Sequence, residues 1–210
     1  MKTEWDERAR ENAMYYVASG RDDWDEEAFF QSGRKNTDQQ ISNQLHIIAR
    51  GRDPKEMAVL EIGCGVGRMT RHLADIFGRV EAVDVSGEMI ARARQNLAQC
   101  SNVGLHETNG ADLGEFEDQA FDFCFSFIVF QHIPSRDVIV NYLKEVHRAL
   151  KPGGMFKFQV SSGNPPEPDT WIGVGFSEDE MVDLAKTIGY DVFKMDGQGT
   201  QYFWNWWIRR

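Results

Sequence analysis

A glycine-rich segment in the first half of the chain constrains the fold more than any other feature. Residues 61–67 read Glu-Ile-Gly-Cys-Gly-Val-Gly, after an apolar run at 58–60 and before a segment whose apolar residues have helical spacing. Glycines permit a tight turn and close approach to the main chain, and a helix N-terminus presents free N–H groups. The segment therefore predicts a strand, a loop and a helix, with an anionic or strongly polar ligand held by the loop.

An acidic residue follows this loop at the distance expected for a ribose ligand. Asp84 ends the next predicted strand and lies 21 positions after Gly63. A carboxylate about 20 residues beyond the first glycine is placed to accept hydrogen bonds from ribose hydroxyls. A dinucleotide fingerprint has Gly or Ala where this chain has Arg68. The ligand is therefore predicted to contain a ribose, and the bulky Arg68 disfavours a nicotinamide dinucleotide.

Strand-like and helix-like segments alternate after residue 54. Short apolar runs predict strands at residues 58–62, 80–85, 103–107, 121–127 and 155–160. Helical spacing and capping residues predict helices between them, at residues 68–77, 87–99 and 136–150. This alternation favours a doubly wound α/β fold, in which helices cover both faces of a parallel sheet.

The two ends of the chain differ from this central pattern. Residues 1–54 are polar, with helices predicted at 3–18 and 38–50, and we interpret them as an N-terminal helical cap on a ligand-binding domain at 55–210. The tail predicts a helix that begins with a capping box of Ser177 and Glu180 and ends at Gly189. Two strands at residues 190–195 and 201–208 then resemble a hairpin.

Charge and composition exclude several classes of protein. The chain has 210 residues and a formal net charge of -10, which disfavours a broad nucleic-acid surface. It has no apolar stretch of about 18 residues, so no membrane span is expected. Cys64, Cys100 and Cys124 match no zinc-ligand spacing, so no metal is expected, and a reduced cytoplasmic setting is the simplest account.

Five motifs in order resemble the class I S-adenosylmethionine-dependent methyltransferases, in their small-molecule (type 11/12-like) branch. The matching segments lie at residues 59–67, 83–86, 110–113, 121–132 and 150–154. The resemblance implies a Rossmann-like seven-stranded sheet in the order 3-2-1-4-5-7-6, with the seventh strand antiparallel. It does not extend over about the first 50 residues.

The resemblance also implies which residues bind the cofactor, S-adenosyl-L-methionine. Glu61 would lie near its ammonium group, Asp84 would bind both ribose hydroxyls, and Asp112 would accept from the adenine amino group. Asp112 could instead be a solvated loop residue. The implied set is Glu61, Gly63, Cys64, Gly65, Gly67, Asp84, Val85, Met89, Ala111, Asp112, Leu113 and Phe127.

His132 is the candidate catalytic residue. It follows the fourth predicted strand, where a neutral imidazole could take a proton from a hydroxyl or amine. The alternative is a structural histidine that is hydrogen-bonded within its own turn. Aromatic side chains such as Tyr16, Trp24 and Trp171 could form a lid on the acceptor site, although ordinary core packing is the simpler role for most of them.

These features together predict an S-adenosylmethionine-dependent methyltransferase that acts on an oxygen or nitrogen atom of a small-molecule acceptor and releases S-adenosyl-L-homocysteine. One alternative is a non-catalytic protein or regulatory subunit that binds these nucleosides. An NAD(P)-dependent oxidoreductase is a further alternative, which Arg68 disfavours. The protein is expected to be a monomer or homodimer, and the sequence does not identify the acceptor.

Overall fold

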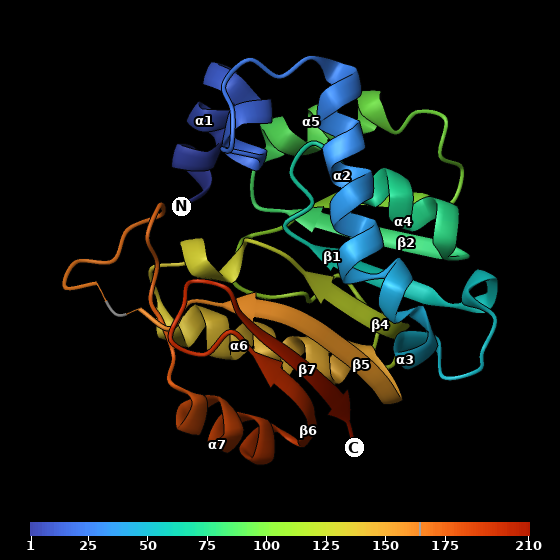
Figure 1. Ribbon diagram of the computed structural model, residues 1–210, viewed down its shortest axis with the longest axis vertical. Coiled ribbons are helices and arrows are strands. Elements are labelled where there is room, and N and C mark those ends of the chain that lie inside the picture. Colours follow the sequence, from blue (N-terminus) through green and yellow to red (C-terminus); the bar gives the residue numbers. More distant parts are fainter. Residues whose placement is uncertain (164) are drawn as a thin grey trace. The chain divides into compact units, whose positions relative to one another are not determined.

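The computed structural model describes residues 1–163 and 165–210, which form two compact units, Met1–Thr108 and Asn109–Arg210 (Figure 1). The strands form one seven-stranded sheet in the order β3-β2-β1-β4-β5-β7-β6. Strand β7 pairs antiparallel with both β5 and β6, whereas β1 with β2, β2 with β3, and β4 with β5 pair in parallel. The predicted Rossmann-like α/β fold, its strand order and its antiparallel seventh strand are confirmed.

The first unit contains the N-terminal helices and the first three strands. Its elements are α1 (Lys2–Val17), α2 (Glu26–Gln40), η1 (Ser42–Gln44), α3 (Leu45–Ala49), η2 (Pro54–Glu56), β1 (Ala58–Ile62), α4 (Thr70–Ile76), β2 (Arg79–Asp84), α5 (Gly87–Asn96) and β3 (Val103–Glu107). Every residue of β1 is buried, including Glu61, as its otherwise apolar sequence predicts for a strand covered on both faces.

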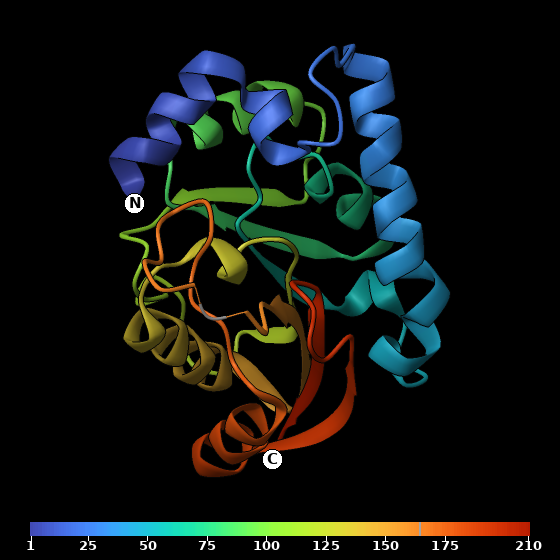
Figure 2. The ribbon, with the colours of Figure 1, turned by 60° about the vertical axis from the view of Figure 1, so that its left-hand side comes forward.

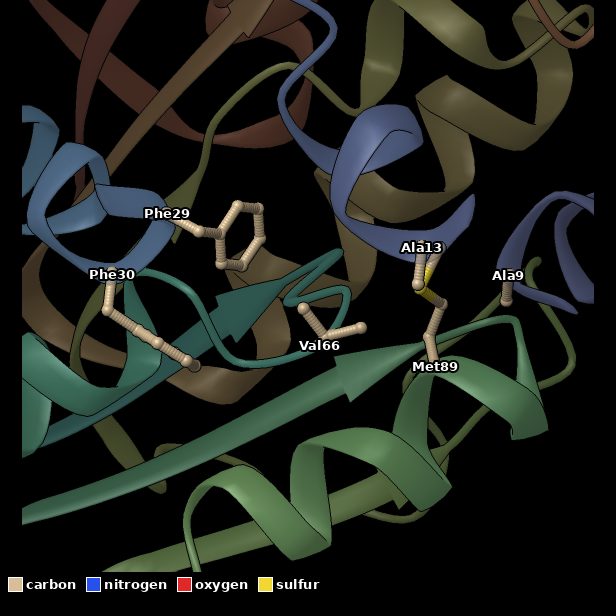
Figure 3. Close-up of a cluster of buried hydrophobic side chains, with 6 residues drawn as sticks. All are labelled: Ala9, Ala13, Phe29, Phe30, Val66 and Met89. Carbon is tan, nitrogen blue, oxygen red and sulfur yellow. The ribbon is translucent and has the colours of Figure 1, made fainter. Parts of the chain in front are cut away.

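Helices α1 and α2 pack onto the start of α5 and the loop after β1 through a buried apolar cluster (Figure 3). Met89 at the start of α5 points toward Ala9 and Ala13 of α1, and Val66 of the loop joins the same cluster. Phe29 and Phe30 of α2 complete it, with their rings edge to face at 5.5 Å. The N-terminal segment is therefore part of the core of the first unit.

The helix predicted at residues 38–50 is wrong in its bounds. Helix α2 begins earlier, because the Asp25 side chain accepts from the Ala28 N–H and caps it. The helix ends at Ile41, whose φ of -123° and ψ of -63° lie outside the helical region, and a short 3-10 turn precedes α3. Helix α1 also bends at Asn12, whose side chain accepts from the Tyr15 N–H and so caps the second half of the helix.

The second unit contains the remaining four strands of the sheet. Its elements are β4 (Phe121–Ser126), η3 (Phe130–His132), α6 (Arg136–Ala149), β5 (Leu150–Val160), α7 (Glu178–Ile188), β6 (Tyr190–Asp196) and β7 (Phe203–Arg209). Figure 2 shows β6 and β7 side by side, with α7 next to β6. The capping box of Ser177 and Glu180 and the left-handed Gly189 at the end of α7 are confirmed.

Strand β5 is longer than the sequence predicts. The segment at residues 151–154, which precedes the strand predicted at 155–160, belongs to β5, and the register between β4 and β5 shifts there. Gly153 has a φ of 75°, a conformation that side chains rarely adopt and that lets the strand kink without ending. No helix within residues 1–163 or 165–210 combines the length and apolar character needed to cross a bilayer.

Candidate functional site

The glycine loop lies directly after β1 and is anchored to the neighbouring strand. The N–H groups of Gly63 and Cys64 donate to the Val83 carbonyl oxygen, at 2.8 and 3.0 Å. Gly63, Gly65 and Gly67 all have positive φ, of 76°, 55° and 85°. Alternating residues in this left-handed region turn the chain sharply from strand to helix, which explains the Gly-x-Gly-x-Gly spacing.

Asp84 binds the glycine loop directly. One carboxylate oxygen accepts from the Gly65 N–H at 2.9 Å, and the other accepts from the Ser86 N–H, also at 2.9 Å. Burial raises the pKa of Asp84, and these main-chain donors act in the opposite direction. A carboxylate oxygen can accept more than one hydrogen bond, so both oxygens keep acceptor capacity for a ligand.

Packing within the first unit also requires two of the glycines. A Cβ on Gly65 would lie 2.7 Å from a methyl group of Val17 in α1, and a Cβ on Gly67 would lie 2.7 Å from Leu97. Both distances are shorter than real carbon contacts allow. Close approach of α1 and Leu97 is therefore a second reason for glycine at these positions, beside the ligand that the sequence predicts.

Glu61 is a buried carboxylic acid in β1, two residues before the first glycine of the loop. Its side chain accepts from the Thr70 hydroxyl at 2.6 Å, and only 5% of the residue is exposed. Burial raises the pKa of Glu61 to about 7, while the Thr70 hydrogen bond and the charge of Arg68 act against this rise. The side chain is therefore poised between its neutral and charged forms at neutral pH.

Cys64 and Arg68 do not contribute reactive groups to the loop. Burial raises the pKa of the Cys64 thiol well above its ordinary value, so the thiol stays protonated and is a poor nucleophile. The Arg68 side chain is buried, and its Nη1 donates to Asn36 at 2.7 Å and to Ser32 at 3.1 Å in α2. Arg68, which occupies the position of the third fingerprint residue, therefore forms part of the contact with α2.

The start of α5 carries the predicted adenine-side residues and a contact that the sequence did not reveal. Met89 is buried in the cluster of Figure 3, and Val85 is half-buried. The Ser86 hydroxyl donates at 2.7 Å to the carboxylate of Asp6 in α1, and the Glu88 N–H donates to the same oxygen at 3.3 Å. Asp6 and Ser86 are 80 positions apart, so no local pattern could have indicated the pair.

The segment at residues 109–113, in the second unit, forms a turn closed by its own side chains. The Asn109 side chain donates to Asp112 at 2.7 Å and accepts from the Ala111 N–H at 2.8 Å. Hydrogen bonds from Asn109 and from the Gly114 N–H hold the pKa of Asp112 below its ordinary value. Leu113 is buried, and its N–H lies 3.4 Å from a carboxylate oxygen of Glu145.

Phe127 and His132 follow β4 in the second unit, each beside an aromatic side chain from a later segment. The half-buried Phe127 stacks on Trp204 of β7, with ring centroids 5.3 Å apart. The Nδ1 atom of His132 lies 2.8 Å from the Trp171 carbonyl oxygen, and the two rings are 5.6 Å apart. The sequence alone did not single out Trp204 as a partner of Phe127.

The structure thus brings together the predicted residues within each unit. In the first unit, Asp84 is hydrogen-bonded to the glycine loop, and Glu61 lies in the strand that leads into this loop. In the second, residues 111–113 share one turn, and Phe127 and His132 lie after β4. Among the residues that the structure describes, no group of three or more His, Cys, Asp or Glu side chains is arranged to hold a metal ion.

Comparisons with known proteins match the central part of the chain. Residues 59–154 match the family model described as methyltransferase domain. The chain is 36% identical over 113 residues to phosphoethanolamine N-methyltransferase 2 of Caenorhabditis elegans, covering 52% of this chain and 25% of that protein. It is 34% identical over 124 residues to demethylmenaquinone methyltransferase of Staphylococcus aureus, covering 55% of this chain and 50% of that protein. It therefore spans between a quarter and a half of the length of these relatives.

Solved structures share the fold over nearly the whole chain. A magnesium protoporphyrin IX methyltransferase of Synechocystis with bound SAH superposes with a TM-score of 0.70 and 16% identity, covering 100% of this chain and 98% of that chain. The DhpI–SAH complex has a TM-score of 0.64 and 22% identity, covering 98% and 96%. The likeness to these structures extends over the N-terminal helices, which the family model does not include.

Proposed function

We propose that this chain is a class I S-adenosylmethionine-dependent methyltransferase that methylates a small-molecule acceptor, a proposal supported by the match of residues 59–154 to a methyltransferase domain. The acceptor atom in this proposal is an oxygen or nitrogen, and the product is S-adenosylhomocysteine. The net charge of -10 supports a small-molecule acceptor over a nucleic acid.

The hydrogen bond from the Gly65 N–H to the Asp84 carboxylate is the observation that carries this proposal. It places a half-buried carboxylate, with acceptor capacity left over, against the glycine loop at the carboxyl end of adjacent parallel strands. That edge of a parallel sheet is where ligands bind in open α/β folds. A ribose with two hydroxyl donors fits this carboxylate, because each hydroxyl can donate to one of its oxygens.

Glu61 supports a ligand with a positively charged amine. Its pKa of about 7 means that a nearby cation would convert it to the charged form at little cost. The ammonium group of S-adenosylmethionine is such a cation. We therefore assign Glu61 to the methionine end of the cofactor, together with the main chain of Gly63, Gly65 and Gly67.

The remaining assignments follow from the family resemblance. Val85 and Met89 would pack near the adenine, and Asp112 would accept from its amino group. The lowered pKa of Asp112 agrees with a charged acceptor, although its hydrogen bonds to Asn109 and Gly114 account for that shift without a ligand. The other residues proposed for the cofactor are Cys64, Ala111, Leu113 and Phe127.

S-adenosylmethionine supplies a methyl group on a positively charged sulfur, which is a good leaving group. The protein has to hold the acceptor in line with the carbon–sulfur bond and exclude water, and such positioning can supply most of the rate acceleration. A base is needed only where the acceptor carries a proton at the reacting atom. We assign that role to His132.

Titration calorimetry on the full chain tests the cofactor assignment. We expect binding of S-adenosylmethionine and S-adenosylhomocysteine, and we expect Asp84→Ala to weaken it by about 1–3 kcal/mol, because a charged acceptor is lost. Asp75→Ala, which removes an exposed carboxylate from α4, is the matched control and should bind normally. Thermal unfolding of both variants separates loss of binding from loss of the fold.

Several outcomes would contradict the proposal. Unchanged affinity in Asp84→Ala would remove Asp84 from the ribose role. Tight binding of NAD(P) without binding of S-adenosylmethionine would favour an oxidoreductase instead. Cofactor binding without release of S-adenosylhomocysteine over a broad panel of acceptors would indicate a non-catalytic binding protein.

A further inference from the structure

Asp6 of helix α1 binds the start of helix α5, next to the proposed cofactor residue Asp84. One oxygen of the Asp6 carboxylate accepts from the Ser86 hydroxyl at 2.7 Å and from the Glu88 N–H at 3.3 Å. Ser86 is buried, and its own N–H donates to Asp84 at 2.9 Å. Two carboxylates from distant segments of the first unit therefore bind the same residue, Asp84 through its main chain and Asp6 through its side chain.

These contacts give the Ser86 side chain a single orientation. Its hydroxyl proton goes to Asp6, and its oxygen accepts from the Met89 N–H at 3.1 Å and so caps α5. The Ser86 N–H that holds Asp84 belongs to the same first turn. Loss of the Asp6 acceptor would leave a buried hydroxyl without a partner, and the turn would shift to satisfy it. The Asp84 carboxylate would then shift with the turn.

Asp6 is a charged acceptor, although a second carboxylate lies near it. Burial acts to raise the pKa of Asp6, but the hydrogen bonds from Ser86 and Glu88 outweigh burial and hold this pKa below its ordinary value. The charge of Asp6 adds to the effect of burial in raising the pKa of Asp84. Lys2, whose Nζ lies 3.5 Å from Asp6, and the positive end of the α5 dipole offset this repulsion. A charged acceptor binds the Ser86 hydroxyl more strongly than a neutral one.

The second half of α1 contacts the other hydrogen-bond partner of Asp84. Val17 lies so close to Gly65 that a Cβ added to this glycine would be 2.7 Å from a Val17 methyl group. The Gly65 N–H donates to the second oxygen of Asp84. Helix α1 bends at Asn12, which has a φ of -161° and a ψ of 85°, and the bend separates the half that carries Asp6 from the half that carries Val17. Helix α1 thus supports both donors to the Asp84 carboxylate.

Other contacts also hold α1 on α5. The Arg10 Nε donates to the Glu88 carboxylate at 3.1 Å, and Ala9 and Ala13 pack on Met89 (Figure 3). These contacts do not involve the Asp6 side chain. The packing of the helix therefore does not depend on Asp6 alone, and a variant at this position should keep the fold.

We propose that Asp6 is a positioning residue for the cofactor, which holds Ser86 and thereby fixes the Asp84 carboxylate in the orientation that binds the ribose hydroxyls. This proposal rests on the proposed methyltransferase function. A carboxylate that is already fixed loses less conformational freedom when the ligand binds, so binding is tighter. Helix α1, which precedes the family match at residues 59–154, is then part of the cofactor site.

Amide hydrogen exchange, measured by NMR on the full chain, tests this coupling without any cofactor. The Gly65 N–H reports on Asp84, because that carboxylate is its acceptor. We expect Asp6→Ala to speed exchange at Gly65 by at least about fivefold. Glu7→Gln removes an exposed carboxylate from the same helix and is the matched control, which should leave exchange unchanged. Unchanged exchange at Gly65 in a folded Asp6→Ala would overturn the proposal, whether or not the protein binds S-adenosylmethionine.

Calorimetry with S-adenosylhomocysteine tests the effect on cofactor binding. We expect Asp6→Ala to weaken binding by about tenfold, as for a lost hydrogen bond to a charged group, and Glu7→Gln to leave it unchanged. Asp6→Asn keeps an oxygen that can accept from the Ser86 hydroxyl, so it should recover most of the loss. Equal losses in the two Asp6 variants would show that the charge of Asp6 matters rather than the hydrogen bond, and would overturn the proposal.

A double-mutant cycle separates positioning from general support of the fold. If Asp6 acts through Asp84, then Asp6→Ala should have little further effect on binding in the Asp84→Ala background, where no carboxylate is left to position. The same loss in both backgrounds would mean that Asp6 acts elsewhere and would overturn the proposal. Ser86→Ala removes the donor of the same hydrogen bond and replaces Asp6→Ala in the cycle if that variant does not fold.

Binding by the unmodified chain separates this proposal from the proposed function. If the unmodified chain binds S-adenosylhomocysteine and both Asp6→Ala and Ser86→Ala bind it equally well, the positioning role is overturned and the methyltransferase function stands. If the unmodified chain binds neither S-adenosylmethionine nor S-adenosylhomocysteine, the proposed function itself is removed, and the role of Asp6 in it as well.

Discussion

Each unit has an ionisable strand side chain whose pKa burial shifts to about 7, and the surroundings of the two differ. In the first unit, burial raises the pKa of Glu61 in β1 to about 7, although the Thr70 hydroxyl and the charge of Arg68 favour its ionised form. In the second, burial lowers the pKa of Lys157 in β5 to about 7, and the charge of Lys194 acts in the same direction.

This difference in surroundings indicates how readily each side chain takes up its charged form. Neighbours that favour the charged form leave Glu61 ready for a cationic ligand, and the amine of the proposed cofactor is one. Lys157 has the aromatic faces of Trp204 and Trp206 at 4.7 and 4.9 Å, which help a cation, but burial and Lys194 outweigh them. The contributions of the two side chains to the stability of the protein therefore change with pH in opposite directions.

Replacing Lys157 should give the largest effect. The folded pKa of about 7 lies below the ordinary 10.5, so the unfolded chain binds the proton more tightly, and stability rises with pH between these values. The free energy of unfolding of Lys157→Met, relative to that of the wild type, should therefore be higher at pH 6 than at pH 10. The change in this relative stability should be on the order of 3–5 kcal/mol. Urea unfolding at both pH values measures this, and a difference independent of pH would contradict it.

Replacing Glu61 should give the opposite pH dependence and a smaller effect. Its folded pKa of about 7 lies above the ordinary 4.5, so its contribution to stability is present below pH 4.5 and is lost as pH rises through 7. Glu61→Gln keeps an acceptor for Thr70 and should gain about 2–3 kcal/mol relative to wild type between pH 5 and pH 8. If the two proteins lose stability in parallel over this range, Glu61 does not titrate near neutrality.

Removing the hydroxyl that bonds to Glu61 should sharpen the comparison. Thr70→Val keeps the shape of the side chain but removes its donor, which lies 2.6 Å from the carboxylate. The charged form of Glu61 then loses its partner, so we expect a loss of about 1 kcal/mol at pH 8 and less at pH 5, where the carboxyl is neutral. Thermal unfolding at both pH values checks this, and equal losses would mean that the bond does not depend on charge.

Removing the charge near Lys157 should give the smallest effect. Lys194 is half exposed, so solvent screens its repulsion, and Lys194→Met should stabilise the protein at pH 7 by only a few tenths of a kcal/mol. Lys186→Met, at an exposed position in α7, is the matched control. A gain as large as that of Lys157→Met would show that Lys194, rather than burial, dominates the pKa of Lys157.

Contacts between near neighbours in sequence were predictable. Ser177 caps α7 through Glu180 because the two are three residues apart, so the pattern and the contact coincide. The order of the seven strands was implied by the family resemblance. By contrast, the break at Ile41 was not visible, because its apolar neighbours keep a helical spacing through a position where the main chain leaves the helix.

In the candidate site, too, some contacts could be predicted from the sequence and others could not. The sequence alone indicated the glycine loop and Asp84, since a strand, a turn and the next strand of a parallel unit must bring them together. It did not indicate the Asp6 contact with Ser86, or the stacking of Phe127 on Trp204. Those partners come from separate segments, and only packing sets their distances.

The sequence by itself determined the α/β class, the loop geometry and the acidic partner of the loop, because these depend on periodicity and on glycine's freedom at positive φ. The tertiary structure decided how Glu61 and Lys157 titrate. Burial and the charges nearby arise from residues far apart in the chain, and no local pattern encodes them.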